Sequence, residues 1–460
     1  MTLLTNKNTP PGPKGNLFLG NAISLGLSGL SKKTIDYMRQ SALDYGDIVS
    51  FRVLNYQFLF VNNPAYIKYI LQNNYSNYSK SSMYEVMKQG LGNGLLNSEG
   101  AFWLQQRRLY QPAFNKESIL HYANSVVECT NKMINRWEVK KRNREILNLS
   151  QEILKLAFDV VGRTMYSTYF SVEQKKIDWK SVVYTLDYVN KLSKNHPFNL
   201  PIKFPTPGNL RFNKALKTLN KTTYEIIEKR RKENKEYNDL LSALMSTPKQ
   251  GTGEKMNDKE LRDEIFTIFS AGHETTSNGL IWTLYLLSQH SEIESKLHKE
   301  LEEVLGNETP TYEDLTKLKY TTQIVYESLR LYPPAWSVGR RSIEEDEIGG
   351  YRIPKGIDIA ISPYILHRHP DFWDNPEVFD PNRFSSENRK KITPFSYIPF
   401  GGGPHVCVGQ NFAIMELILV IAMIAKQFRL RIKDNQKVEI DPCITLRPLK
   451  EVFMTIQERN

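Results

Sequence analysis

The first regular feature of the chain is a pair of short apolar stretches near the N-terminus. Residues 48–53 and 58–61 are rich in valine, isoleucine and phenylalanine, which favour β-strands. A short connection separates the two stretches. This spacing predicts a β-hairpin.

Helical periodicity dominates from about Ser98 onward. Apolar residues recur every three to four positions in residues 115–137, 150–168 and 210–235, as on one face of an amphipathic helix.

The longest predicted helix covers residues 257–289. Asn257 stands three residues before Glu260, as in a capping box, and the apolar-rich run that follows contains no proline. A helix of roughly thirty residues is about 45 Å long. It would cross a whole domain.

The C-terminal third combines short strands, an irregular segment and a last helix. A helix ends near Leu331, strand character returns at residues 351–353 and 357–362, and residues 363–404 are rich in proline, asparagine and aromatics. The apolar residues 410–427 predict a buried core helix rather than a membrane span, because Glu416 interrupts a short apolar run.

The organisation of these elements predicts one domain, residues 1–460. Neither a repeat nor a long flexible linker divides the chain. Helical signals dominate from about Ser98 onward.

Composition limits the class of protein without choosing the function. With 40% hydrophobic and 24% charged residues, the chain is typical of a globular protein. The 61 basic and 50 acidic residues give a net charge of +11, which favours acidic partners. Glutamates interleave with the basic residues around 228–236, as on a solvated helix face, so nucleic-acid binding is not expected.

The cysteines and the N-terminus bear on the cellular compartment. Cys129, Cys407 and Cys443 are too few and too scattered for a disulfide framework or a paired-thiol zinc site, which favours a reducing compartment. Residues 1–20 form a proline-rich lead-in without the apolar run of a signal peptide or membrane anchor. A soluble, cytoplasmic protein is expected.

One cysteine lies in a setting that suggests chemistry. The segment from Phe400 to Gly409 places Cys407 among glycines, directly before the predicted last helix. Glycines let a flat ligand approach the backbone, and a helix N-terminus stabilises a thiolate. Cys407 could therefore be a nucleophile or a metal ligand, whereas an arbitrary lone cysteine is usually a small buried hydrophobe.

The spacing of Phe400, the glycines, the basic His405, Cys407 and Gly409 resembles the haem-binding signature of the cytochrome P450 superfamily. The resemblance implies a mainly α fold with a small β region. It also implies haem b with Cys407 as the iron ligand, buried between the long central helix and the helix after the cysteine. His405 stands where the family more often has arginine. A histidine would contact a haem propionate with a pH-dependent charge.

A second signature lies upstream of the cysteine. Glu327 and Arg330 share one helical face, which alone predicts no more than a surface ion pair. The resemblance adds Arg383 as a third, structural member that locks the core behind the cysteine loop. Asn382 replaces a commoner acidic residue there.

The middle of the long helix carries polar groups on an apolar surface. Ala271, Gly272, Glu274 and Thr275 resemble the oxygen-activation site of the family, in which the Thr275 hydroxyl contacts dioxygen and Glu274 relays protons from water. Gly272 is expected to leave room for oxygen, and His273 to be a neighbour rather than a ligand. The alternative for Thr275 is a hydrogen bond to its own helix.

Three further residues match haem-propionate positions of the family. Trp103 and Arg107 share one helical face, and Arg340 stands ten residues after Arg330. Residues 90–94 contain three glycines, but no strand precedes them and no Lys-Ser/Thr pair follows, so they predict a loop over the substrate pocket rather than a phosphate loop.

The resemblance implies a monooxygenase that inserts one atom of O2 into an apolar substrate. Electrons are expected from a separate donor, an acidic ferredoxin with its reductase, because the chain is basic and Arg389, Lys390 and Lys391 precede the cysteine loop. A peroxide-driven enzyme, a haem-thiolate isomerase or dehydratase, and a haem-based sensor or carrier remain the alternatives.

The substrate pocket is predicted from apolar and aromatic positions. A long-chain fatty acid or a terpenoid is the expected substrate. The candidate residues are Met83, Leu96, Phe269, Trp336, Val338 and Ile444.

Overall fold

The computed structural model describes residues 8–26, 30–167, 179–196, 201–233, 235, 237–249 and 253–459. Residues 1–7 of the predicted lead-in lie outside this range, as do residues 168 and 234 of the predicted helical stretches and residue 236 of the charged segment 228–236.

Helices form most of the structure, as the periodicity predicts. They are α1 (Ala22–Leu25), α2 (Lys32–Tyr45), α3 (Pro64–Lys68), α4 (Ser82–Leu91), α5 (Gly100–Tyr110), α6 (Lys116–Arg142), α7 (Leu149–Tyr166), α8 (Trp179–Lys194), α9 (Pro207–Lys232), α10 (Leu240–Ser246), α11 (Asp258–Gln289), α12 (Ser291–Leu305), α13 (Lys319–Leu331), α14 (Pro363–Leu366) and α15 (Gln410–Gln427). Short 3-10 turns include η7 (Asn388–Lys391) and η8 (Gly403–His405).

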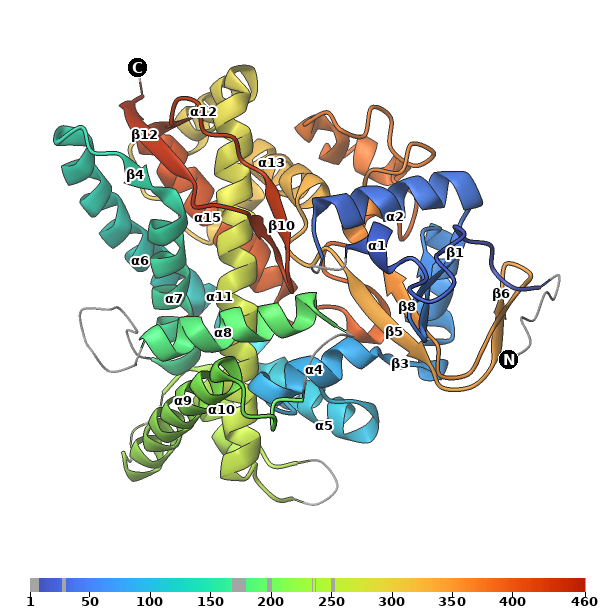
Figure 1. Ribbon diagram of the computed structural model, residues 1–460. Helices are drawn as coiled ribbons and strands as arrows, with labels where there is room; N and C mark the ends of the chain where they lie inside the picture. Colours follow the sequence, from blue (N-terminus) through green and yellow to red (C-terminus); the bar gives the residue numbers. More distant parts are fainter. Residues whose placement is uncertain are drawn as a thin grey trace.

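The strands form small sheets. They are β1 (Ile48–Val53), β2 (Tyr56–Val61), β3 (Tyr78–Lys80), β4 (Leu147–Asn148), β5 (Val338–Ser342), β6 (Asp346–Ile348), β7 (Tyr351–Ile353), β8 (Asp358–Ile361), β9 (Phe428–Ile432), β10 (Ile440–Pro442), β11 (Leu446–Pro448) and β12 (Phe453–Glu458). The largest sheet has the order β1-β2-β8-β5-β3, and smaller ones pair β4-β12-β9, β10-β11 and β6-β7. In Figure 1 the sheet with β4 and β12 lies on the opposite side of α11 from the one with β1, β5 and β8. The predicted hairpin is confirmed as the antiparallel pair β1-β2.

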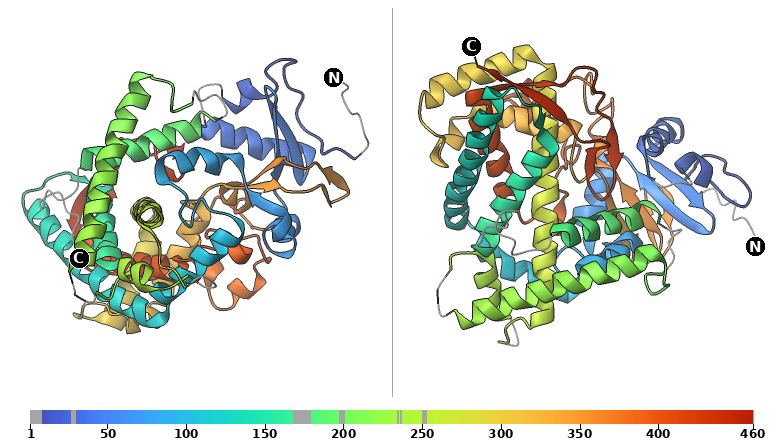
Figure 2. Two further views of the ribbon diagram at one scale, coloured as in Figure 1. Left: turned by 90° about the horizontal axis from the view of Figure 1, so that it is seen from below. Right: turned by 60° about the vertical axis from the view of Figure 1, so that its left-hand side comes forward.

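Helix α11 is the central element of the fold. Its N-terminus has the predicted capping box, in which Asn257 accepts from the Glu260 amide and Glu260 accepts from the Asn257 amide. The helix has 32 residues and is therefore about 48 Å long. In Figure 1 it separates helices α6, α7 and α9 from the five-stranded sheet, and Figure 2 (left) shows it end-on among the other helices.

Helix α15 begins three residues after Cys407 and packs on α6, α11 and α13. Of the helices in the described residues, it alone is long and apolar enough to cross a membrane, but 67% of that stretch is buried inside the protein. Burial in the core explains its apolar composition, as predicted.

Candidate active site

The loop before α15 holds Cys407 and contains a glycine, Gly403, whose conformation and close backbone contact exclude other residues. Gly403 has a φ of +65°, and a Cβ there would lie 1.8 Å from the carbonyl oxygen of Leu71. The Cys407 amide donates to the carbonyl oxygen of Phe400 over 3.0 Å and closes the turn. These contacts fix the backbone of the loop that carries the thiol.

The Cys407 thiol is accessible although it lies deep in the fold. Desolvation raises its pKa, while the backbone amide of Gly409 and the charge of Arg107 lower it. Its side chain is nevertheless exposed, whereas Cys129 and Cys443 are buried. A thiol that protein atoms leave uncovered inside the fold, beside an amide and a cation, suits a thiolate ligand.

Basic side chains lie close together beside the loop that carries Cys407. The ring of His405 stacks on Trp103 with centroids 3.8 Å apart. Burial lowers the pKa of His405 to about 3, with further contributions from Arg340, Lys80 and Arg107. Its buried Nδ1 has no hydrogen-bond partner among the described residues. Trp103, Arg107, Arg340 and His405, predicted separately from the sequence, are thus brought to one place.

Lys80 belongs to this cluster and was missed in the sequence. It is the last residue of β3, whose partner strand β5 carries Arg340 directly opposite. Its Nζ donates to the carbonyl oxygens of Leu95 and Ser98 over 3.2 and 2.6 Å. Burial lowers the pKa of Lys80 to about 7. No local signal marks this lysine, because its role depends on a strand pairing 260 residues away.

The middle of α11 is partly exposed, whereas most of the helix is buried. Ala271 is exposed, and Gly272 and Thr275 are half-buried. The Thr275 hydroxyl donates to the carbonyl oxygen of Ala271 over 2.6 Å, which is the alternative weighed for it from the sequence. A Cβ at Gly272 would lie 3.1 Å from Val161 in α7, so this glycine permits close helix packing, while its place beside oxygen stays a prediction.

Glu274 is held by the turn between β10 and β11. Its Oε1 accepts from the Thr445 hydroxyl over 2.7 Å and from Asn190 over 3.5 Å. Asn278 donates to Thr445 over 3.0 Å, and Asn190 accepts from the Ile444 amide over 3.0 Å. The carboxylate therefore has a fixed orientation, which the sequence did not reveal.

A cavity of about 410 Å³ with polar and apolar lining residues opens beside Glu274. Asn190, Ser277, Arg447 and Lys450 are among the residues that line it. His273 also lines the cavity. Its Nδ1 lies 2.6 Å from the Phe269 carbonyl oxygen, to which it donates a hydrogen bond in the tautomer with the proton on Nδ1. A space of this size with several polar side chains in its lining holds several waters, so Glu274 has access to proton-carrying solvent.

The predicted structural residues are assembled in the core. Arg330 makes a two-pronged contact with Glu327, with both hydrogen bonds at 2.7 Å, and both side chains are fully buried. Arg383 Nε lies 3.4 Å from Glu327. Burial raises the pKa of Glu327, and the hydrogen bonds from Arg330 oppose that shift.

His367 connects this ion pair to the cysteine loop. Its Nδ1 lies 3.2 Å from the Arg330 carbonyl oxygen, to which it donates, and its Nε2 accepts from the Ile398 amide over 2.9 Å. The ring is completely buried, and burial lowers its pKa to about 3. A lone histidine in an irregular segment gave no signal of this role.

The six predicted pocket residues fall into different surroundings. Leu96 and Ile444 pack on one apolar cluster formed by α4, α8 and α9, and Met83 is half-buried on α4. Trp336 is buried and donates from Nε1 to the Cys443 carbonyl oxygen over 2.7 Å, and Val338 begins β5. Phe269 packs on Phe158, with ring centroids 5.1 Å apart.

An accessible thiol among cations suits a haem-thiolate protein, and comparisons with known proteins identify the family. Residues 10–454 match the family described as Cytochrome P450. The chain is 34% identical over 389 residues to Cyclooctat-9-en-7-ol 5-monooxygenase of Streptomyces melanosporofaciens, covering 84% of this chain and 83% of that protein. It is 30% identical over 397 residues to Pentalenene oxygenase of Streptomyces avermitilis, covering 86% of each.

The fold also matches the crystal structure of cytochrome P450DA heme domain, with a TM-score of 0.87, 23% identity and 98% of each chain covered. The chain therefore belongs to the cytochrome P450 family. It is a cytochrome P450 monooxygenase, mainly α-helical with a small β region, and its cofactor is haem b bound through a cysteine thiolate.

The residues present fit that cofactor. Haem b carries two propionate carboxylates, and the cluster of Lys80, Arg107 and Arg340 offers positive charge within reach of the Cys407 loop. The unpartnered Nδ1 of His405 is a further polar contact for a carboxylate.

Proposed function

We propose that Cys407 is the iron ligand and that the enzyme hydroxylates or epoxidises a terpenoid. The observation that carries the proposal is the accessible Cys407 thiol in the interior, next to Arg107 and Gly409. Trp103, Arg107, Arg340 and His405 would hold the propionates, with Lys80 as an added contact. Phe400 and Gly409 would shape the loop around the thiolate, within one domain that spans the chain.

Haem b supplies the reductive activation of dioxygen, and its thiolate ligand donates electron density that favours cleavage of the O–O bond. The protein's share is to position groups and to deliver protons. Glu274 takes protons from water in the 410 Å³ cavity, where Thr445 and Asn190 orient its carboxylate. Thr275 passes a proton onward when its hydroxyl rotates away from the Ala271 carbonyl oxygen.

The substrate class rests on the pocket and on the relatives. Leu96 and Ile444 belong to an apolar surface, which suits a hydrocarbon skeleton. Two relatives that cover more than four-fifths of the chain are oxygenases of bacterial terpenoids. A long-chain fatty acid, the other candidate from the sequence, is an outcome that the substrate test distinguishes.

The first experiment is a carbon monoxide difference spectrum of the reduced protein and of Cys407→Ala. A strongly red-shifted Soret band in the parent alone supports Cys407 as the ligand. A spectrum typical of a histidine-ligated globin in the parent would overturn the assignment. Spin-state titrations with cyclic terpenes and with long-chain fatty acids then decide the substrate class.

We further propose that the enzyme is soluble and cytoplasmic and takes electrons from an acidic ferredoxin. The exposed Arg389, Lys390 and Lys391 on η7 precede the cysteine loop, and Arg389 lies over the Tyr326 ring at 4.7 Å. Reversing all three charges should slow reduction by ferredoxin, most strongly at low salt. A matched reversal of the exposed Lys214, Lys217 and Lys221 on α9 should not. An equal rate in the first variant would exclude this surface.

A further inference from the structure

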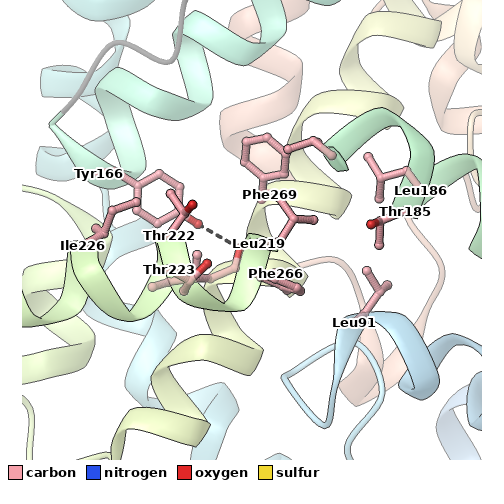
Figure 3. Close-up of a pocket in the computed structure, with 12 residues that line it drawn as sticks. Leu91, Tyr166, Thr185, Leu186, Leu219, Thr222, Thr223, Ile226, Phe266 and Phe269 are labelled. Carbon is pink, nitrogen blue, oxygen red and sulfur yellow. Dashed lines mark hydrogen bonds between the residues drawn. The ribbon is translucent and has the colours of Figure 1, made fainter. Parts of the chain in front are cut away.

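A second cavity lies behind the central helix. It has a volume of about 60 Å³ and is lined by residues of α4, α7, α8, α9 and α11. In Figure 3, Tyr166 and Ile226 line one side, Thr185 and Leu186 the other, and Phe269 lies between them.

This cavity is separate from the open face of α11 that carries Thr275. Successive helical residues are rotated by about 100°. Ile265 and Phe269, which line the cavity, therefore point to the side of α11 away from Ala271 and Thr275. The contact of Phe269 with Phe158 in α7 agrees with this direction.

The walls are apolar apart from a few hydroxyl groups, and no charged side chain lines them. Two of the hydroxyls have partners: Tyr166 donates to the Ile265 carbonyl oxygen over 3.0 Å, and Thr222 donates to the Thr218 carbonyl oxygen over 3.2 Å. Thr185 is 2% exposed, and its Oγ1 has no partner among the described residues. A buried hydroxyl without a partner is unfavourable unless a ligand or water supplies one.

We propose that this cavity is a binding site for a small neutral molecule with an apolar body and one oxygen that accepts a hydrogen bond from Thr185. A group the size of a water molecule needs about 10–15 Å³ of cavity volume. The cavity of about 60 Å³ therefore holds roughly four to six heavy atoms. The absence of charge from the lining excludes carboxylates and amines as preferred ligands.

Two side chains connect this cavity to the predicted substrate pocket. Leu91 and Leu186 line the cavity and also pack with the apolar cluster that includes Leu96 and Ile444. An occupant therefore contacts side chains that border the predicted substrate pocket. The ligand acts as an effector rather than as a substrate.

The test uses a matched pair of probes on the haem-loaded enzyme in its diamagnetic, carbon monoxide-bound ferrous form. Butan-2-one has an acceptor oxygen, and 2-methylbut-1-ene has the same shape without it. The δ1 methyl groups of Ile226 and Ile265 report on the cavity by NMR, and that of Ile444 reports on the substrate side.

The expected result is that both probes shift the Ile226 and Ile265 methyls, and that the ketone binds about three- to tenfold more tightly. Thr185→Val should remove this preference and leave alkene binding unchanged, which shows that the cavity is intact. Thr130→Val is the control, because that buried hydroxyl donates to Val126 in α6. Ile226→Phe should abolish binding of both probes.

Three outcomes would overturn the proposal. They are shifts confined to Ile444, a ketone preference that survives in Thr185→Val, and undiminished binding in Ile226→Phe.

Discussion

The Thr445 hydroxyl donates a 2.7 Å hydrogen bond to Oε1 of Glu274, although 171 positions separate the two residues in the chain. Thr445 accepts in turn from Asn278, and Asn190 donates to the same carboxylate oxygen of Glu274. Three side chains therefore define the orientation of the carboxylate. The proposed proton donor is thus positioned by the turn between β10 and β11, far from it in the sequence.

Glu274→Gln should lower substrate turnover by 10²-fold or more, because the amide cannot exchange a proton in the way a carboxyl group does. Thr445→Val, which leaves Glu274 only the 3.5 Å contact with Asn190, should cost a few-fold. Product formation per reductant consumed is the measurement, with substrate affinity as the control. Parent-like turnover in Glu274→Gln would remove the residue from the mechanism.

Thr275→Ala should uncouple reductant use from product formation, so that hydrogen peroxide is released instead. The variant loses the hydroxyl that now donates to Ala271 and is proposed to pass a proton onward. Thr275→Ser keeps a hydroxyl and should stay coupled. Undiminished product formation by Thr275→Ala with peroxide as sole oxidant would instead indicate a peroxide-driven enzyme.

Arg107→Ala and Arg340→Ala should each accelerate haem loss by about 10- to 100-fold, since hydrogen bonds to charged groups contribute about 1.5–3 kcal/mol. The rate of haem transfer to an excess of a scavenging protein measures the effect. The exposed Arg108, next to Arg107 on α5, provides the control substitution to alanine. Identical rates in all three variants would place the propionates elsewhere.

His367 should make the protein less stable as the pH falls from 7 to 5. Its native pKa of about 3 lies below the unfolded value of about 6.5, so the unfolded state binds the additional proton between these values. The loss between pH 7 and pH 5 is about 2 kcal/mol.

Urea unfolding at several pH values tests this prediction. His367→Gln retains an acceptor for the Ile398 amide but does not titrate, so its stability should depend less on pH. Parallel pH curves for the parent and the variant would contradict the prediction.

Local patterns were sufficient for much of the fold. The capping box of Asn257 and Glu260 marks the start of α11 because both hydrogen bonds join neighbours in sequence. Residues 410–427 coincide with α15, and residues 351–353 with β7. In these elements the periodicity and the end signals lie within the element itself.

Contacts between segments that are distant in the chain could not be predicted from the sequence. Lys80 reaches the cationic cluster through the pairing of β3 with β5, and Thr445 reaches Glu274 through the β10-β11 turn. The direction of Phe269 depends on how α7 packs against α11. Residue type and local spacing contain none of these relationships.

The parallel pairing of β2 with β8 has a consequence for how the chain folds. Phe58 lies opposite Asp358, so the sheet closes a loop of 300 residues, which costs roughly 5 kcal/mol of entropy before the strands gain any contact. An isolated two-stranded hairpin is marginally stable in water. The β1-β2 hairpin therefore waits for most of the chain to be synthesised and compacted, and meanwhile exposes the edge of β2 to other chains. A lower concentration of nascent chains, which reduces encounters between such exposed edges, should for this reason increase the yield of folded protein.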